Sequence, residues 1–336
     1  MSARRRRRGV AMKKIRLAAA SAVLLMVAGC GGGTDQPAAS GPGFPVTVTN
    51  CGVDVTFDAA PQRVVLLKSA AVPYLHALGV MDRVTARAGQ YPKEYYDAAT
   101  LAELDRIPLL TDKTDTSGHL QISKEVVISQ QPDLVLGEVD NLSRDALSAV
   151  DIPLLEEPAM CPDSTAVPSF DDIYRQLETY GRVFGREAEA GTAVAALRER
   201  MTKIQTETGT SAGRSAAVLY PTVGGGTTYA YGTASMAHPQ LAAAGFRNVF
   251  GDVTDRVFEV TVEELLGRNP DVLILLHGDG DPAAVAQALT ALPGADKLNA
   301  VRDGQVMTQL FNFTEPPSPL AIDGLERIVR HFEDHA

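Results

Sequence analysis

The chain has 336 residues, of which 45% are hydrophobic and 21% charged, with no Trp and only three Cys. This composition suits a soluble protein with roughly two domains, and it excludes a disulfide-dense scaffold and a multi-Cys zinc or iron–sulfur site. The net charge is −10, but residues 1–29 hold eight cations and no acid, so the remainder carries −18. So acidic a body argues against a nucleic-acid partner, because phosphates are met by Lys and Arg.

The N-terminal segment, residues 1–29, has the order of an export signal. Cations precede an apolar run over residues 17–29, which is too short for a membrane helix of ~20 residues. The run ends in Val27-Ala28-Gly29-Cys30, which resembles the bacterial lipobox. That resemblance implies that Cys30 is acylated, becomes the first residue of the mature protein and anchors it outside the cytoplasm at the cell membrane.

Other interpretations of this segment stay open. They are a plain signal peptide, a true start at Met12, and twin-arginine export marked by the arginines at residues 4–8. Residues 30–45 are rich in Gly and Pro, also contain Ser and Thr, and have almost no large apolar residue. This composition predicts a flexible linker between the lipid and the folded body.

Two cysteines remain after Cys30, namely Cys51 and Cys161. Exported proteins meet an oxidising compartment, so a disulfide is expected, and two free thiols are the alternative. The bond would close a loop of about 110 residues and contribute about 4–5 kcal/mol in the chain-entropy model. No catalytic thiol would then be left.

The rest of the chain alternates short apolar strands with helices, the pattern of mostly parallel sheets covered on both faces. A β-hairpin is predicted over residues 46–57. In the first half we expect strands at 63–67, 84–86, 132–137 and 152–155 and helices at 71–78 and 142–150. In the second half we expect strands at 216–220, 270–276 and 305–307 and helices at 238–244, 262–268, 282–292 and 318–331.

Between the halves, residues 169–208 lack Pro and carry apolar residues at three- and four-residue spacings, which predicts one long helix. Ser169 with Asp172 gives it an N-cap signal, while Gly181 and Gly185 could kink or split it. The predicted fold class is therefore α/β, with two Rossmann-like lobes joined by a long helix and a ligand cleft between them. The expected domains are an N-terminal lobe over 46–168, the connecting helix over 169–208 and a C-terminal lobe over 209–336.

One motif occurs twice, at residues 123–135 and 261–273. Each copy has a Ser or Thr N-cap, a Glu two residues later, a short helix, Pro-Asp and a buried strand. The copies place Glu125 and Glu263 at equivalent positions, one on each lobe. A favourable contact with the helix dipole would explain a single Glu at this position. Two matched ones suggest a paired surface contact.

Further segments complete a family resemblance. They are Pro61-Gln62-Arg63-Val64-Val65, Leu78-Gly79-Val80-Met81-Asp82-Arg83-Val84, Tyr180-Gly181-Arg182-Val183-Phe184-Gly185 and Ala244-Gly245-Phe246-Arg247-Asn248-Val249-Phe250. With the lipobox and the repeat, the chain resembles, over roughly residues 46–333, a periplasmic binding protein of the long-helix class III type. That group serves ABC importers of ferric siderophores, haem and vitamin B12. The resemblance implies a lipid-anchored monomeric receptor whose Glu125 and Glu263 insert among arginines of the two permease halves.

Ligands of open α/β sheets bind at the carboxyl ends of strands, here the facing edges of the lobes. The candidate ligand-binding residues there are Lys68, Arg87, Tyr91, Glu138, Tyr220, Tyr229, Tyr231, Arg256, His277 and Phe313. Aromatic side chains with a few cations suit a bulky, partly anionic iron chelate, so the predicted ligand is a ferric siderophore. Packing in the core or on the surface is the alternative for any single Tyr, and a simple hydrogen bond for His277.

Other ligands, and a function of another class, remain alternatives to a ferric siderophore receptor. Vitamin B12 binders of this family use Trp on the rim, which this chain lacks, and haem is a further candidate. A bare divalent cation would need His and carboxylates from both lobes, so no metal site is predicted. An exported α/β hydrolase is the alternative from another class. However, no Gly-x-Ser-x-Gly, Walker or dinucleotide-binding motif occurs, so neither catalytic residues nor a cofactor are predicted.

Overall fold

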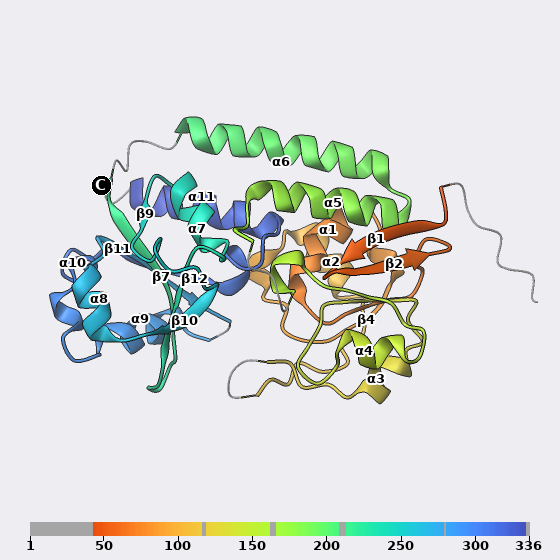
Figure 1. The fold of residues 1–336 in the computed structure, drawn as a ribbon, viewed down its shortest axis with the longest axis horizontal. Helices are drawn as coiled ribbons and strands as arrows, with labels where there is room; N and C mark the ends of the chain where they lie inside the picture. Colours follow the sequence, from red (N-terminus) through yellow and green to blue (C-terminus); the bar gives the residue numbers. More distant parts are fainter. Residues whose placement is uncertain (1–42, 116–118, 162–165, 208–212, 279, 334–336) are drawn as a thin grey trace, which may run out of the picture. The chain divides into compact units, whose positions relative to one another are not determined.

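The computed structural model describes residues 43–115, 119–161, 166–207, 213–278 and 280–333 (Figure 1). The predicted signal peptide, Cys30 and the linker up to residue 42 lie outside the described residues. Within the described ranges, no helix combines the length and the apolar character that crossing a membrane requires.

A four-stranded parallel sheet in the order β4–β3–β5–β6 forms the first lobe, preceded by the predicted antiparallel hairpin β1–β2. The sheet strands are short and rich in Val and Leu, and β3, β5 and β6 are buried throughout, as a sheet covered on both faces requires. The strands are β1 (Val46–Asn50), β2 (Val53–Phe57), β3 (Val64–Leu66), β4 (Val84–Arg87), β5 (Leu134–Leu136) and β6 (Leu154–Leu155). The helices are α1 (Val72–Ala77), α2 (Ala98–Leu104), α3 (Lys124–Ile128) and α4 (Arg144–Ser148), with 3-10 turns η1 (Ser69–Ala71), η2 (Met81–Arg83), η3 (Lys93–Tyr95) and η4 (Pro158–Met160).

The second lobe has a six-stranded mixed sheet in the order β10–β8–β7–β11–β12, with β9 beside β7. The predicted strands β7, β11 and β12 are parallel. Two further strands extend the sheet beyond β7, where β8 pairs antiparallel with β7 and the edge strand β10 pairs antiparallel with β8. The strands are β7 (Ser215–Pro221), β8 (Thr228–Tyr231), β9 (Arg247–Asn248), β10 (Val257–Val260), β11 (Val272–His277) and β12 (Val306–Leu310). The helices are α7 (Ala237–Ala243), α8 (Val262–Arg268), α9 (Pro282–Thr290), α10 (Asn299–Arg302) and α11 (Pro319–Glu333), with 3-10 turns η5 (Ala295–Lys297) and η6 (Phe311–Phe313).

The single long helix predicted over residues 169–208 is instead two helices, α5 (Phe170–Phe184) and α6 (Glu187–Glu207). Gly185 adopts the left-handed conformation with φ 64° and ends α5. Gly181 lets the helices approach, because a Cβ there would lie 2.6 Å from the Ala190 Cβ. The chain therefore turns back, and α6 packs along α5 and α11, which makes α6 the helix that connects the lobes (Figure 1). The predicted capping at Ser169 is confirmed, since its N–H donates to Asp172 Oδ2 at 2.6 Å.

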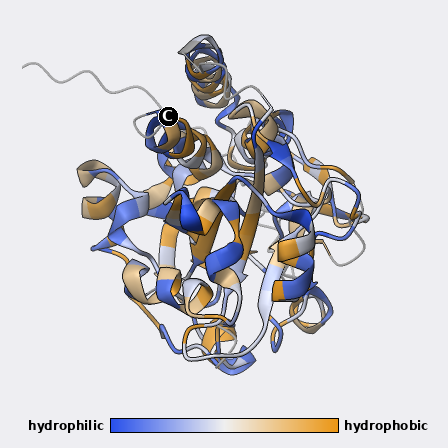
Figure 2. Ribbon diagram, turned by 90° about the vertical axis from the view of Figure 1, so that its left-hand side faces the viewer, coloured by the Kyte–Doolittle hydropathy of each residue, from blue (hydrophilic) through white to orange (hydrophobic). Residues whose placement is uncertain are grey.

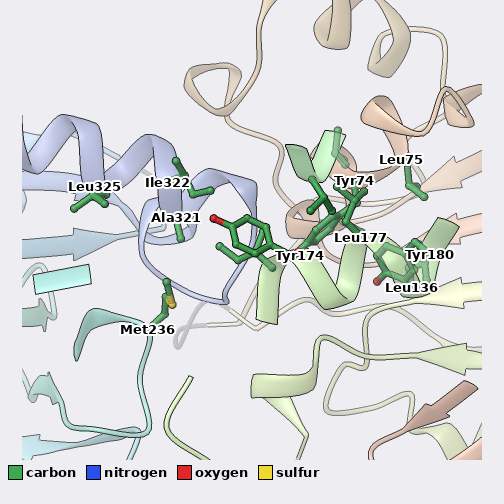
Figure 3. Packing of buried hydrophobic residues seen from close by; sticks show 14 of the residues in the cluster. Tyr74, Leu75, Leu136, Tyr174, Leu177, Tyr180, Met236, Ala321, Ile322 and Leu325 are labelled. Atoms are coloured by element: carbon green, nitrogen blue, oxygen red, sulfur yellow. The ribbon is translucent and has the colours of Figure 1, made fainter. Parts of the chain in front are cut away.

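One apolar core runs through both lobes. Figure 3 shows Ala321, Ile322 and Leu325 of α11 in the same cluster as Tyr74 of α1 and Leu177 of α5. Burial of a Leu or Ile side chain of this cluster contributes about 1.5–3 kcal/mol. Figure 2 shows orange, apolar strands in the interior and helices banded in orange and blue, as expected for helices with one buried face. The continuous core predicts a stiff connection between the two sheets.

Candidate functional site

The duplicated motif forms the same local structure in both lobes. Ser123 caps α3 by accepting a hydrogen bond from the Val126 N–H, and Thr261 caps α8 by accepting one from the Glu264 N–H. Glu125 and Glu263 both lie in the first turn of their helices and are exposed. Neither takes part in an ion pair among the side chains that the structure describes. Two exposed carboxylates, one on each lobe, are therefore available to a partner.

The Pro-Asp step of each copy ties the motif to the neighbouring strand. Asp133 accepts hydrogen bonds from the Gln62 and Arg63 N–H groups at 2.7 and 2.8 Å, just before β3. Asp271 accepts from the Ser215 N–H at 2.8 Å, at the start of β7. The repeated sequence thus reflects a repeated structural need, which is to hold the motif beside the first strand of its sheet.

A cavity of about 600 Å³ lies between the lobes. Four of the predicted ligand-binding residues line it: Arg87 and Tyr91 from the first lobe and His277 and Phe313 from the second. Its other lining residues come from the segments after β4 and after α2, from the start of α9, from β12 and from α11: Gly89, Gln90, Pro92, Glu94, Leu109, Asp112, Gly280, Pro282, Thr308, Gln309, Leu310 and Arg327. The volume matches ordinary small-molecule sites, which span about 300–1,000 Å³.

On the first-lobe wall, an arginine lies on an aromatic ring. The Arg87 Cζ is 4.8 Å from the centroid of the Tyr91 ring, and its Nε donates to the Ile107 carbonyl at 3.3 Å. The Tyr91 hydroxyl donates to the Ala88 carbonyl at 3.1 Å. These contacts hold the ring and the guanidinium in place, so that the remaining N–H groups of Arg87 can meet an oxygen-rich ligand.

The second-lobe wall has a similar arrangement. The Arg327 Cζ lies 4.2 Å from the centroid of the Phe313 ring, and this ring packs edge-on against Tyr95 of the first lobe at 5.1 Å. The Tyr95 hydroxyl accepts a hydrogen bond from the Asn312 N–H at 2.9 Å, and Asn312 Nδ2 donates to Ser69 Oγ at 3.1 Å. The two lobes are therefore in direct contact beside the cavity wall that Phe313 contributes.

The fold agrees with the comparison with known proteins. The family described as periplasmic binding protein matches residues 64–309. The chain belongs to the periplasmic binding protein family. A crystal structure from Saccharomonospora viridis, described as an ABC-type Fe3+-hydroxamate transport system, is 57% identical and superimposes with a TM-score of 0.82, covering 86% of this chain and 99% of that one. An uncharacterized ABC transporter substrate-binding lipoprotein of Bacillus subtilis is 26% identical over 90% of this chain and 92% of its own length. A cobalamin-binding protein of Halobacterium salinarum is 26% identical over 87% of this chain and 75% of its own.

Two predicted ligand residues of this binding protein have partners inside the first lobe. Lys68 Nζ lies 2.5 Å from Glu156 Oε2, and Glu156 is buried. The Glu138 carboxylate accepts a hydrogen bond from the Arg144 N–H at the start of α4, at 3.2 Å. Neither Lys68 nor Glu138 lines the cavity.

The neighbour of Glu156, Glu157, is also buried. Its burial and the charge of Glu156 raise the pKa of Glu157 to about 8, so this carboxyl is mostly protonated at neutral pH.

The other four predicted residues lie around β7, β8 and β10 and do not line the cavity either. The Tyr220 hydroxyl accepts a hydrogen bond from the Gly278 N–H at 3.2 Å, so it helps to position the backbone next to His277. Tyr229 is 37% exposed, and Tyr231 is buried. Arg256 pairs with the fully buried Glu315 at 3.4 Å.

Among the described residues, one group has the spacing of metal ligands: Asp115, His119 and Asp140, all exposed. None of the three lines the cavity, and His277, which does, belongs to no such group. Besides arginines and aromatic rings, the lining of the cavity includes Glu94, Asp112 and His277.

Gly324 of α11 holds the Phe313 segment against the binding protein's second lobe. A Cβ at this position would lie 1.7 Å from the Phe313 carbonyl oxygen, which also accepts a hydrogen bond from Gln240 Nε2 at 2.6 Å. We expect Gly324→Ala to lower the free energy of unfolding by about 1–3 kcal/mol or more, since the added methyl must displace backbone. Thermal unfolding measures the loss.

Gly191→Ala on α6 is the matched control, because Gly191 is exposed and a Cβ there meets no atom within 4 Å. Alanine favours a helix over glycine by up to about 1 kcal/mol, so this variant should be as stable as the wild type or more so. Equal melting temperatures for the two variants would contradict the role assigned to Gly324.

Proposed function

We propose that this chain is a lipid-anchored extracytoplasmic binding protein that captures a ferric siderophore between its lobes and delivers it to an ABC permease. The observation that carries the proposal is the 57% identity, over 86% of this chain, to a protein described as part of an Fe3+-hydroxamate transport system. The cavity supports it, because stacked arginines on both walls suit the oxygen-rich surface of a ferric chelate. A substrate-binding role leaves no support for the hydrolase alternative.

Membrane attachment is proposed to come from lipid on Cys30, followed by the linker over residues 30–45. The Bacillus relative is itself named a lipoprotein. The proposed permease contacts are Glu125 and Glu263, which are exposed and sit at matched positions in the two lobes. Carboxylates that meet arginines fix the register of a complex and speed its formation.

Cobalamin is the second candidate ligand, because a relative that spans most of this chain is named a cobalamin-binding protein. The absence of Trp from this chain weighs against it, and the lower identity of that relative gives it less weight than the hydroxamate assignment.

A thermal-shift screen tests the proposal on the chain shortened to residues 31–336. The panel contains ferric hydroxamates, ferric catecholates, ferric citrate, haem and cobalamin. A ligand at a hundred times its dissociation constant adds about 2.7 kcal/mol, which raises the melting temperature by several degrees. We expect a rise with a ferric hydroxamate and none with its iron-free form. A rise with cobalamin alone would transfer the assignment to that ligand, and no rise with any compound would overturn it.

A further inference from the structure

The main cavity continues into a second, smaller one of about 330 Å³. Glu94, Phe313 and Arg327 line both cavities, so the two meet at the stacked pair of Phe313 and Arg327. Beyond that pair, the second cavity is lined by charged side chains of α6 and α11, among them Arg200 and Arg330. A ligand that fills the main cavity can therefore extend an arm into a strongly polar pocket.

Three arginines and three acids line this pocket, and the charges of Arg327 and Arg330 also act on Asp323 and Glu326, one helical turn away. Arg200 binds both acids of α11 that line it, with 2.6 Å to Asp323 and 2.5 Å to Glu326. Arg327 and Arg330 have no ion-pair partner among the side chains that the structure describes. They lie three residues apart on α11, so they share one face of the helix. Their N–H groups are donors only, and a carboxylate can accept two of them from one guanidinium.

We propose that Arg327 and Arg330 form an anion subsite, and that the ligand is a ferric chelate with a free carboxylate besides its iron-binding groups. This inference rests on the proposed function and names the ligand class more closely. The chelate core occupies the main cavity between Arg87 and Arg327, and the carboxylate arm reaches Arg330. Glu94 of the first lobe also lines this pocket and is exposed. Its negative charge repels an anionic arm and so opposes the attraction by the two arginines.

One linear ferric trihydroxamate, ferrioxamine B, provides matched probes. Its terminal amine is left free, acetylated or succinylated, which changes the charge of the arm from positive to neutral to negative and keeps the iron core constant. Dissociation constants are measured by calorimetric titration of the full-length protein in detergent micelles. We expect the succinylated form to bind tightest and the free amine weakest, and the difference to shrink at high salt.

Two variants with opposite expected effects complete the test. Arg327→Ala with Arg330→Ala should weaken binding of all three forms, because Arg327 also lines the cavity that holds the chelate core. It should weaken binding of the succinylated form about tenfold more than binding of the acetylated form, as loss of charged hydrogen bonds implies. Glu94→Gln should tighten binding of the succinylated form. The control, Arg175→Ala with Arg182→Ala, removes the same charge from exposed positions on α5 that line neither cavity. It should change binding of neither the succinylated nor the acetylated form.

The outcomes separate the subsite from the proposed function. Equal affinity of the wild type for all three arms, or equal losses for all three in the double variant, would overturn the subsite while the receptor assignment stands. If none of the three forms binds and the screen finds no other ferric chelate, the proposed function itself fails.

Discussion

Reversing both matched charges, Glu125→Lys with Glu263→Lys, should abolish uptake of the ligand and leave its affinity unchanged. Both carboxylates are exposed and lie outside the cavity, so neither contributes to ligand binding. A permease surface that presents arginines would then face like charges on both lobes, and such contacts cost several kcal/mol. Uptake of radiolabelled ferric chelate is measured in cells in which the variant replaces the wild-type gene, and affinity is measured on the purified protein.

Glu178→Lys with Glu199→Lys is the matched control for this prediction. Both are exposed acids on α5 and α6, and the double variant changes the net charge by the same amount. We expect it to take up the chelate normally. If the docking variant also loses ligand affinity, or if the control loses uptake equally, Glu125 and Glu263 have no specific role in contacting the permease.

The predicted strands and helices of both lobes are present because their signals are local. Short apolar runs such as residues 270–276 become fully buried parallel strands, and the motif at residues 261–273 carries its own cap and its own strand anchor. The split of the predicted long helix was also encoded locally, at Gly185, but a glycine alone does not say whether a helix bends or ends. That outcome depends on the packing of Gly181 against Ala190, a contact between the two helices that only the fold creates.

The residues of the candidate site were harder to predict from the sequence than the strands and helices. Strand ends correctly predicted Arg87 and His277 on the cavity, whereas Lys68, just after β3, pairs with a buried acid instead. Arg256 comes just before β10 rather than after a strand, and it also pairs with a buried acid. Those partners, Glu156 and Glu315, are distant in sequence from the cations that they hold. Arg327 was missed for a different reason. It lies in the middle of an amphipathic helix, where the sequence does not distinguish a binding arginine from an ordinary solvent-exposed one. Only the fold places it over the Phe313 ring.

Removing the disulfide should cause the largest loss of stability. Cys51 and Cys161 are bonded, as predicted, and the bond closes a 110-residue span that contains every strand of the first sheet. The chain-entropy model gives about 4.7 kcal/mol for a loop of this size, because the cross-link restricts the unfolded chain. Cys51→Ala with Cys161→Ala should therefore lower the melting temperature by roughly 10 °C or more.

The bond also reinforces a junction that hydrogen bonds already define. Asn50, next to Cys51, accepts a hydrogen bond from the Glu156 N–H and donates one to the Glu156 carbonyl, both at 2.8 Å. These hydrogen bonds hold the hairpin beside β6 independently of the disulfide. Since the native contacts do not depend on the bond, the variant should fold and bind its ligand below its new melting temperature. A reductant should lower the melting temperature of the wild type to that of the variant and leave the variant unchanged. A variant as stable as the oxidised wild type would show that the cross-link does not restrict the unfolded chain as the loop model requires.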